Sequence, residues 1–347
     1  MERPTSSQEP SPRLDVRDRL ALIYASPGPY VSVYLQTRPL LRNADHDTVA
    51  RWTGMRRALV SDGAPRKALD AIDARLSLPQ PDESAAIGVI AAADGRTVVD
   101  HALEPPRRDV AMVDTLPYAA PMVEWDQRRV PHLVVVVDRS GADIVSFHPD
   151  QRTEMTSVDG AHDAVVEAAR RRVVEQSARL VVVSGDPGRA QEVADALVPR
   201  VGPMCNVVVE VDEAIDTVAE ATVRQVSNTV ATTTVGLLRE FRFLAEHDAA
   251  VDGMEETLAA LRAHRPGVLL IHDDPTDERR VWLGSGPTDI HATPASGRNA
   301  SARFVDAAIR AAIAAGMRVH VIPSTGDHGP DDGAAHNHSG TPAVEAF

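Results

Sequence analysis

Apolar and polar positions along the chain of 347 residues alternate between strand-like and helix-like spacing. In the first third, Val31–Leu35 has a period of two and predicts a half-buried strand. Two apolar runs flank Asp94-Gly95, a dipeptide typical of tight turns, and together they predict a β-hairpin. Apolar residues three and four positions apart predict helices at about residues 12–25, 45–59 and 65–76.

Prolines are frequent in the next stretch, at positions 105, 106, 117 and 121. Proline removes a backbone donor and restricts its neighbours, so it interrupts regular structure. We therefore expect an extended connector that ends near Arg129.

The middle third contains the most apolar strand, His132–Val137, and a turn at Ser140-Gly141. The pattern over residues 132–246 predicts two strands, then a helix, a strand, a helix, a strand and a long helix, with a short loop at 149–161. Its strands are apolar throughout rather than alternating. This is typical of a sheet covered by helices on both faces.

The last third repeats this mixture of helices and strands. Spacing predicts helices at 254–263 and 302–315, and strands at 268–271, 281–283 and 319–322. Residues 324–340 are rich in Gly, Asp and His and are expected to form a mobile loop before a short tail at 340–347.

The chain is too long for one ordinary domain, and its pattern favours an α/β protein of three domains. We expect a disordered lead-in at 1–13, an α+β first domain at 14–130, a middle domain at 131–250 with a mixed sheet covered by helices, and a last domain at 251–347. The first 12 residues lack an apolar signal segment, and no run of about 18 apolar residues exists. Together with a single cysteine, Cys205, this favours a cytoplasmic protein.

Charge is unevenly distributed along the chain. The net charge is −14, which excludes a simple basic nucleic-acid coat, but the first 130 residues hold 17 of the 36 basic residues and have a net charge of −1. All basic residues but Lys67 are arginine, whose planar guanidinium pairs well with phosphate.

These basic residues are the candidate contacts to RNA phosphate, with a solvated, salt-bridged surface as the alternative interpretation of each cluster. The candidates are Arg51, Arg56, Arg57, Arg66, Lys67, Arg107, Arg108, Arg128, Arg129 and Arg152.

Other polar motifs favour structural interpretations. Ser184–Gly188 joins a strand to a helix and could bind an anion, but no phosphate-loop or dinucleotide motif is present, so helix capping is the preferred interpretation. His272-Asp273-Asp274 is expected to cap a loop, and Cys205 to fill a core position. The histidines and aspartates of 327–338 match no zinc spacing. We expect no metal and no cofactor.

Three strings, in order, resemble a known superfamily: Gly28–Tyr34, Asp114–Tyr118 and Val134–Asp143. With Leu237–Phe241 and Val251-Asp252-Gly253, they resemble the bacterial branch of the archaeal and eukaryotic release factor and Pelota superfamily, and within it the Balon-like ribosome hibernation factors. The resemblance extends over about residues 14–347.

The resemblance implies three domains in the A site of the 70S ribosome. The first would face the decoding centre, the middle one the peptidyl-transferase centre, and the last would be an α/β/α sandwich with a fold like that of ribosomal protein L7Ae. It also implies elongation factor Tu as a partner.

The sequence departs from the superfamily at the residues that release peptide. Gly-Gly-Gln and Gly-Ser-Gln are absent, as is the Asn-Ile-Lys-Ser string used in stop-codon recognition. We therefore expect no enzymatic activity, and a factor that silences translation by occupying the A site under stress. Two alternatives remain: a rescue enzyme that uses Gln151, and a nucleotide-binding protein that uses Ser184–Gly188.

Overall fold

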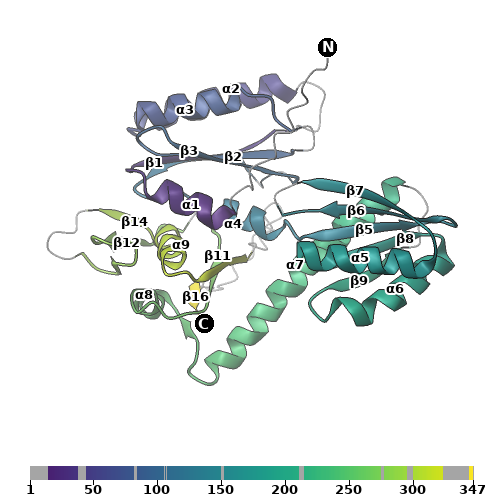
Figure 1. Ribbon diagram of the computed structural model, residues 1–347. Helices are drawn as coiled ribbons and strands as arrows, with labels where there is room; N and C mark the ends of the chain where they lie inside the picture. Colours follow the sequence, from purple (N-terminus) through teal and green to yellow (C-terminus); the bar gives the residue numbers. More distant parts are fainter. Residues whose placement is uncertain are drawn as a thin grey trace, which may run out of the picture. The chain divides into compact units, whose positions relative to one another are not determined.

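The computed structural model forms two compact units (Figure 1). The middle unit is Gln127–Thr233, and the terminal unit combines Val16–Asp126 with Thr234–Phe347. Helix α7 (Ile215–Ala245) contributes residues to both. The structure describes residues 15–37, 44–81, 84–104, 106, 108–149, 152–210, 215–274, 277–294, 300–322 and 344–346.

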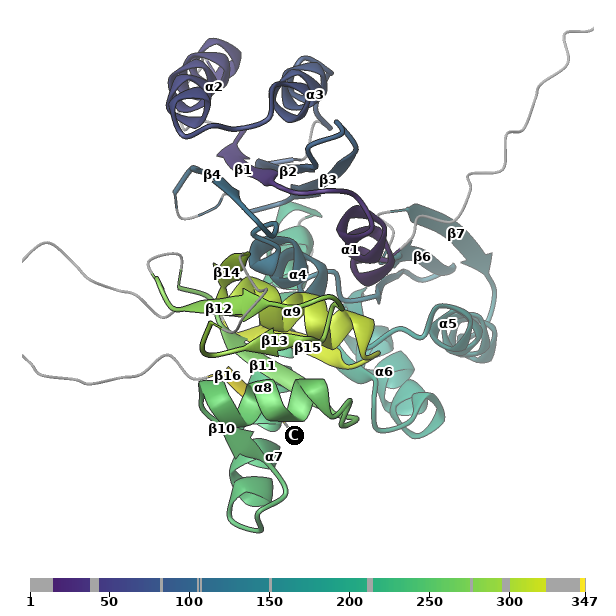
Figure 2. The same cartoon turned by 90° about the vertical axis from the view of Figure 1, so that its left-hand side faces the viewer.

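The first sheet of the terminal unit is antiparallel, with the order β3-β2-β1-β4. Helices α2 and α3 cover one face, and α1 and α4 lie on the other (Figure 2). The predicted hairpin at Asp94-Gly95 is confirmed and joins β2 to β3. The elements are α1 (Val16–Tyr24), β1 (Tyr30–Gln36), α2 (Ala44–Ser61), α3 (Arg66–Leu76), β2 (Ala86–Ala91), β3 (Thr97–Ala102), β4 (Val110–Asp114) and α4 (Ala120–Gln127).

Strand β1 is buried on both faces, so the prediction of a half-buried strand was wrong. Val31, Val33 and Leu35 pack beneath α2 and α3, while Tyr34 packs on the opposite face. The polar residue that suggested alternation, Ser32, is 1% exposed and accepts a hydrogen bond from the backbone N–H of Tyr118. A polar side chain with a partner is compatible with burial, and hydropathy alone does not reveal the partner.

The expected extended connector was also wrong, because it contains β4 and α4. Strand β4 pairs with β1 at the edge of the sheet. Pro121 lies in the first turn of α4, where a missing N–H costs no helical hydrogen bond. These prolines mark the boundaries of elements rather than their absence.

The middle unit contains a five-stranded mixed sheet with the order β7-β6-β5-β8-β9. Strands β5, β8 and β9 are parallel, and β6 and β7 are antiparallel to their neighbours. Helices α5 and α6 pack on one face and α7 on the other, which confirms the expected mixed sheet covered by helices (Figure 1). The elements are β5 (His132–Val137), β6 (Gly141–Phe147), β7 (Thr153–Asp159), α5 (His162–Gln176), β8 (Leu180–Gly185), α6 (Pro187–Val201) and β9 (Asn206–Glu210).

The prediction of a loop at 149–161 was wrong, because Thr153–Asp159 forms strand β7. Its residues alternate between exposed and half-buried positions at the edge of the sheet. Only Met155 and Val158 are apolar, and Met155 is 65% exposed. A polar edge strand lacks the apolar run that marks a strand in sequence, so the pattern missed it.

The last segment is an α/β/α sandwich, as expected. Leu270 of its mixed sheet packs against Leu237 and Phe241 of α7, whereas Leu269 and Ile271 join a core with α8 and α9 on the other face. The sheet has the order β10-β16-β11-β15, and a small sheet β13-β12-β14 accompanies it. The elements are β10 (Val251–Asp252), α8 (Met254–Arg262), β11 (Val268–His272), β12 (Arg280–Leu283), β13 (Ile290–His291), β14 (Ser301–Arg303), α9 (Phe304–Ala314), β15 (Arg318–Ile322) and β16 (Val344–Ala346).

The expected tail at 340–347 was wrong, because Val344–Ala346 forms strand β16, which pairs with both β10 and β11. The expected mobile loop at 324–340 and the lead-in at 1–13 lie outside the described residues. Within the described part of the chain, no helix is long and apolar enough to cross a membrane.

The first and last segments of the terminal unit share one hydrophobic core. It joins Tyr34, Met122 and Trp125 to Phe304 and Ile309. Each sheet nevertheless takes its strands from only one of the three expected domains. The boundaries near residues 130 and 250 remain predictions.

A buried polar network, which we call the seam, joins these two segments. Tyr118 donates a hydrogen bond of 2.6 Å to Oδ2 of Asp273. The Arg303 guanidinium lies 4.9 Å from the centre of the Tyr118 ring and pairs with Asp306 at 3.3 Å. Asp273 therefore makes a contact across the unit, rather than the local loop cap that was expected.

Asp306 is the most strongly perturbed carboxyl in the seam. It is 1% exposed, and burial raises its pKa from 3.8 to about 8. The nearby carboxyls of Asp273 and Asp114 act in the same direction, while Arg303 opposes them. Removal from water has the largest effect, so burial favours the protonated form of Asp306.

Replacing Asp306 with asparagine is expected to remove a pH dependence of stability. The folded chain keeps a proton that the unfolded chain loses above 3.8, so the free energy of unfolding falls as the pH rises toward about 8. Between about pH 5 and about pH 7 we expect Asp306→Asn to lessen that fall by about 2–3 kcal/mol. Urea unfolding at several pH values measures it. Asp62→Asn on the exposed α2–α3 turn is the control, and equal pH profiles for both variants would contradict the prediction.

Candidate nucleic-acid interface

The outer side of α2 and α3 carries the largest group of candidate residues. Trp52 and Leu59 of α2, with Leu69 and Ile72 of α3, face the sheet. Helical spacing turns the basic positions away from that apolar stripe. Residues 44–76, which span α2 and α3, contain six basic side chains and five aspartates, so this part of an acidic chain has a small positive excess of one charge.

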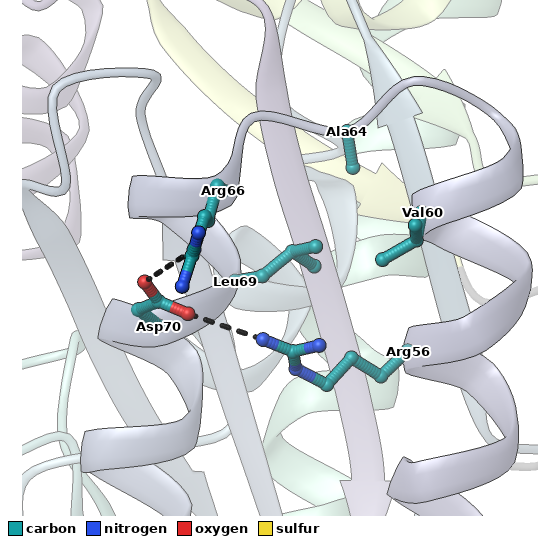
Figure 3. A pocket seen from close by; sticks show the side chains of 6 residues that line it. All are labelled: Arg56, Val60, Ala64, Arg66, Leu69 and Asp70. Carbon is teal, nitrogen blue, oxygen red and sulfur yellow. Dashed lines mark hydrogen bonds and ion pairs between the residues drawn. The ribbon is translucent and has the colours of Figure 1, made fainter.

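A shallow pocket of about 290 Å³ lies between the two helices (Figure 3). Its polar lining is Arg56, Arg66 and Asp70, and its apolar lining is Val60, Ala64 and Leu69. The Asp70 carboxylate lies between the two guanidinium groups, with one oxygen 3.1 Å from Nη2 of Arg56 and the other 3.7 Å from Nε of Arg66.

Asp73 fixes the orientation of Arg56 from below this pocket. It accepts a hydrogen bond of 2.9 Å from Nε of Arg56 and one of 2.7 Å from Nε1 of Trp52. The sequence interpretation missed the roles of Asp70 and Asp73. The spacing of four between Arg66 and Asp70 was a visible signal, because such pairs are adjacent on a helix.

Arg57 and Lys67 are the most available cations on this surface. Both are exposed, and neither makes an ion pair with a residue that the structure describes. They directly follow Arg56 and Arg66 on their helices, about 100° further round each helix, and Lys67 lies near the β2–β3 turn at Gly95. The α2–α3 surface thus brings together Arg56, Arg57, Arg66 and Lys67.

Arg51 lies on the other side of α2 and has structural partners. It pairs with Asp109, which also accepts a hydrogen bond from the backbone N–H of Gln36, and it donates to the carbonyl oxygen of Gln36 at 2.7 Å. Its side chain is 28% exposed. It connects α2 to the end of β1.

The other candidates lie elsewhere. Arg108 is exposed just before β4, and Arg107 lies outside the described residues. Arg128 and Arg129 are half-buried, and with the exposed Arg152 they belong to the middle unit. The structure therefore does not gather all ten candidates on one surface.

The loop at Ser184–Gly188 has the geometry of a helix cap. The Asp186 side chain accepts a hydrogen bond from the backbone N–H of Arg189, so a carboxylate already occupies the N-terminus of α6. Ligand crevices form in parallel sheets where successive connections leave on opposite faces, whereas α5 and α6 both pack on one face. The arrangement disfavours a nucleotide site here.

Within the described residues, no group of three or more His, Cys, Asp or Glu side chains is placed to hold a metal ion. The His- and Asp-rich stretch at 327–338 and Gln151 lie outside those residues. His272 is half-buried at the end of β11, and Cys205 is a buried core residue.

Comparisons with known proteins give partial and distant similarity. No family model matches the chain. Two uncharacterized proteins of Mycobacterium tuberculosis, MT2704 and Rv2629, are 27% identical over 148 residues, which is 41% of this chain and 38% of each relative. The match therefore spans less than half of those relatives.

Among solved structures, archaeal translation termination factor aRF1 is 17% identical with a TM-score of 0.24, covering 90% of this chain and 93% of its own. Archaeoglobus fulgidus Pelota is 12% identical with a TM-score of 0.38, covering 89% and 86%. Saccharomyces cerevisiae Dom34, described as a translation termination-like factor, is 10% identical with a TM-score of 0.40, covering 69% and 74%. At these TM-scores the likeness is not evidence of activity.

Two arginine substitutions on α2 are expected to differ in their effect on stability, because Arg51 holds structural partners and Arg57 is exposed. Arg51→Ala removes charged hydrogen bonds at a partly buried position and is expected to lower the free energy of unfolding by about 1–3 kcal/mol. Arg57→Ala changes an exposed residue and is expected to have an effect within about 0.5 kcal/mol. Urea unfolding of both variants measures the difference, and equal losses would contradict these assignments.

Proposed function

We propose that this chain is a ribosome-associated factor that binds ribosomal RNA through the α2–α3 surface and silences translation without releasing peptide. The observation that carries the proposal is the positive excess of that surface in a chain whose net charge is −14. Phosphate contacts supply much of the affinity of nucleic-acid-binding proteins.

The position of two cations strengthens this proposal. Arg66 and Lys67 occupy the first turn of α3, which has no acidic residue and no side-chain N-cap. The positive end of the helix dipole disfavours cations there. Helix stability therefore does not explain these residues, whereas an anionic partner would benefit from both the cations and the backbone N–H groups.

The acidic remainder of the chain is compatible with an RNA partner. Negative charge elsewhere repels phosphate, so binding depends on the orientation that presents the α2–α3 surface. Such a protein associates with RNA less indiscriminately than a uniformly basic one.

The finer features of the proposal rest on the resemblance of the sequence to release factors and Pelota. They are occupation of the A site under stress, as in hibernation, and association with elongation factor Tu. The absence of Gly-Gly-Gln from the sequence supports a role without peptidyl-tRNA hydrolysis.

Sedimentation with purified 70S ribosomes tests the proposal. The double variant Arg57→Ala/Lys67→Ala is expected to bind more weakly, and the slope of log affinity against log salt should decrease by about one to two units. These side chains are exposed, so folding should be retained.

The matched control is Arg200→Ala/Arg239→Ala, which removes two exposed arginines from α6 and α7. It changes the net charge equally and should leave the slope nearly unchanged. A wild-type chain that never sediments with ribosomes would overturn the proposed function. Equal effects of the two double variants would overturn the assignment of the surface.

A further inference from the structure

We infer that the pocket between α2 and α3 is a binding site for an RNA phosphodiester group, and that Asp70 occupies it in the unbound protein as an exchangeable internal counter-ion. The inference rests on the proposed function and adds a specific site and a means of regulating its affinity.

The geometry of the pocket fits this exchange. Asp70 presents one oxygen to Arg56 and the other to Arg66, as the two unesterified oxygens of a phosphodiester would (Figure 3). Guanidinium groups bind both carboxylate and phosphate oxygens. Asp70 makes a single hydrogen bond to Arg56 and a longer ion pair with Arg66. A phosphate can therefore take over the contacts of Asp70 with little movement of the arginines.

Solvent exposure distinguishes Asp70 from Asp73, the other aspartate that pairs with Arg56. The side chains of Asp70 and Arg66 are 55% and 92% exposed, so their ion pair is largely solvated and easily exchanged. Asp73 is less exposed, at 40%, and is also held by Trp52. Asp73 can thus keep Arg56 oriented while Asp70 leaves.

The surrounding charges favour a polyanion over a single ion. Arg57 and Lys67 follow the pocket residues Arg56 and Arg66 in the chain, are exposed, and have no ion-pair partner among the described residues. A chain of phosphates can contact these cations and the pocket together, whereas an isolated phosphate must displace Asp70 with the pocket contacts alone. This difference would suppress binding of small free anions.

The test compares Asp70→Asn with Asp62→Asn in the full chain. Both remove one exposed negative charge from the α2–α3 region, but only Asp70 lies between the guanidinium groups. The probe is a fluorescein-labelled RNA hairpin, followed by anisotropy at several salt concentrations. Asp70→Asn is expected to bind about threefold to fivefold more tightly than wild type, and Asp62→Asn less than about twofold.

A second arm adds Arg66→Gln to the Asp70→Asn variant. Because Arg66 is almost fully exposed, folding should be unaffected, and the gain in affinity should be lost. Inorganic phosphate, measured by calorimetry, should bind Asp70→Asn more tightly than wild type. Equal affinities of the Asp70 and Asp62 variants for RNA, or a gain that survives Arg66→Gln, would overturn the inference.

Ribosome sedimentation separates this inference from the proposed function. If the hairpin results are as expected but the chain never sediments with ribosomes, the pocket stands and the proposed function fails. If the wild type sediments and Asp70→Asn behaves like Asp62→Asn on the hairpin, the proposed function stands and the pocket inference fails.

Discussion

The buried guanidinium of Arg303 is the constraint on which the terminal unit depends. It is 7% exposed, and a buried charge is tolerated only with close partners. Those partners are the Tyr118 ring, the Asp306 carboxyl and the carbonyl oxygens of Asp274 and Asp277. Tyr118 comes from the first segment and the others from the last, so the charge is fully satisfied only when both segments are folded together.

This arrangement extends from the seam to the surface through β1. Tyr34 of β1 donates a hydrogen bond to the carbonyl of Tyr118 on the seam side, while Val33 packs beneath α2 and α3 on the other. Arg51 and Asp109 then connect α2 to the edge of the same sheet. The basic residues of α2 and α3 therefore lie on a sheet that is packed on both of its faces, which favours a defined spacing between the cations.

The sequence predicted those elements whose signals are local. The hairpin at Asp94-Gly95 and helix α3 follow from turn chemistry and apolar spacing. Strand β7 escaped prediction because it is a polar edge strand, and β16 because it is short and pairs with strands distant in sequence. Strand β4 does contain an apolar run, at 110–113, but it lies in the proline-rich stretch that was expected to be a connector. The basic residues were identifiable by type, but the role of Arg51 depends on Asp109, which is 58 positions away in the sequence. Of the contacts made by these basic residues, only the pairing of Arg66 with Asp70 could have been predicted from helical spacing, because the two residues are four positions apart.

The carboxylates on the α2–α3 surface determine over what distance its excess of positive charge can attract phosphate. Cations paired with aspartates attract distant phosphates less than unpaired ones, since opposite charges cancel beyond a few ångströms in salt. Close to the surface, the exposed Asp70 can exchange with phosphate, whereas Asp109, 13% exposed, remains with Arg51. Long-range attraction is thus weak, while short-range recognition of a correctly spaced series of phosphates is retained. Under the proposed function, this combination would give an acidic protein specificity for one RNA surface among many.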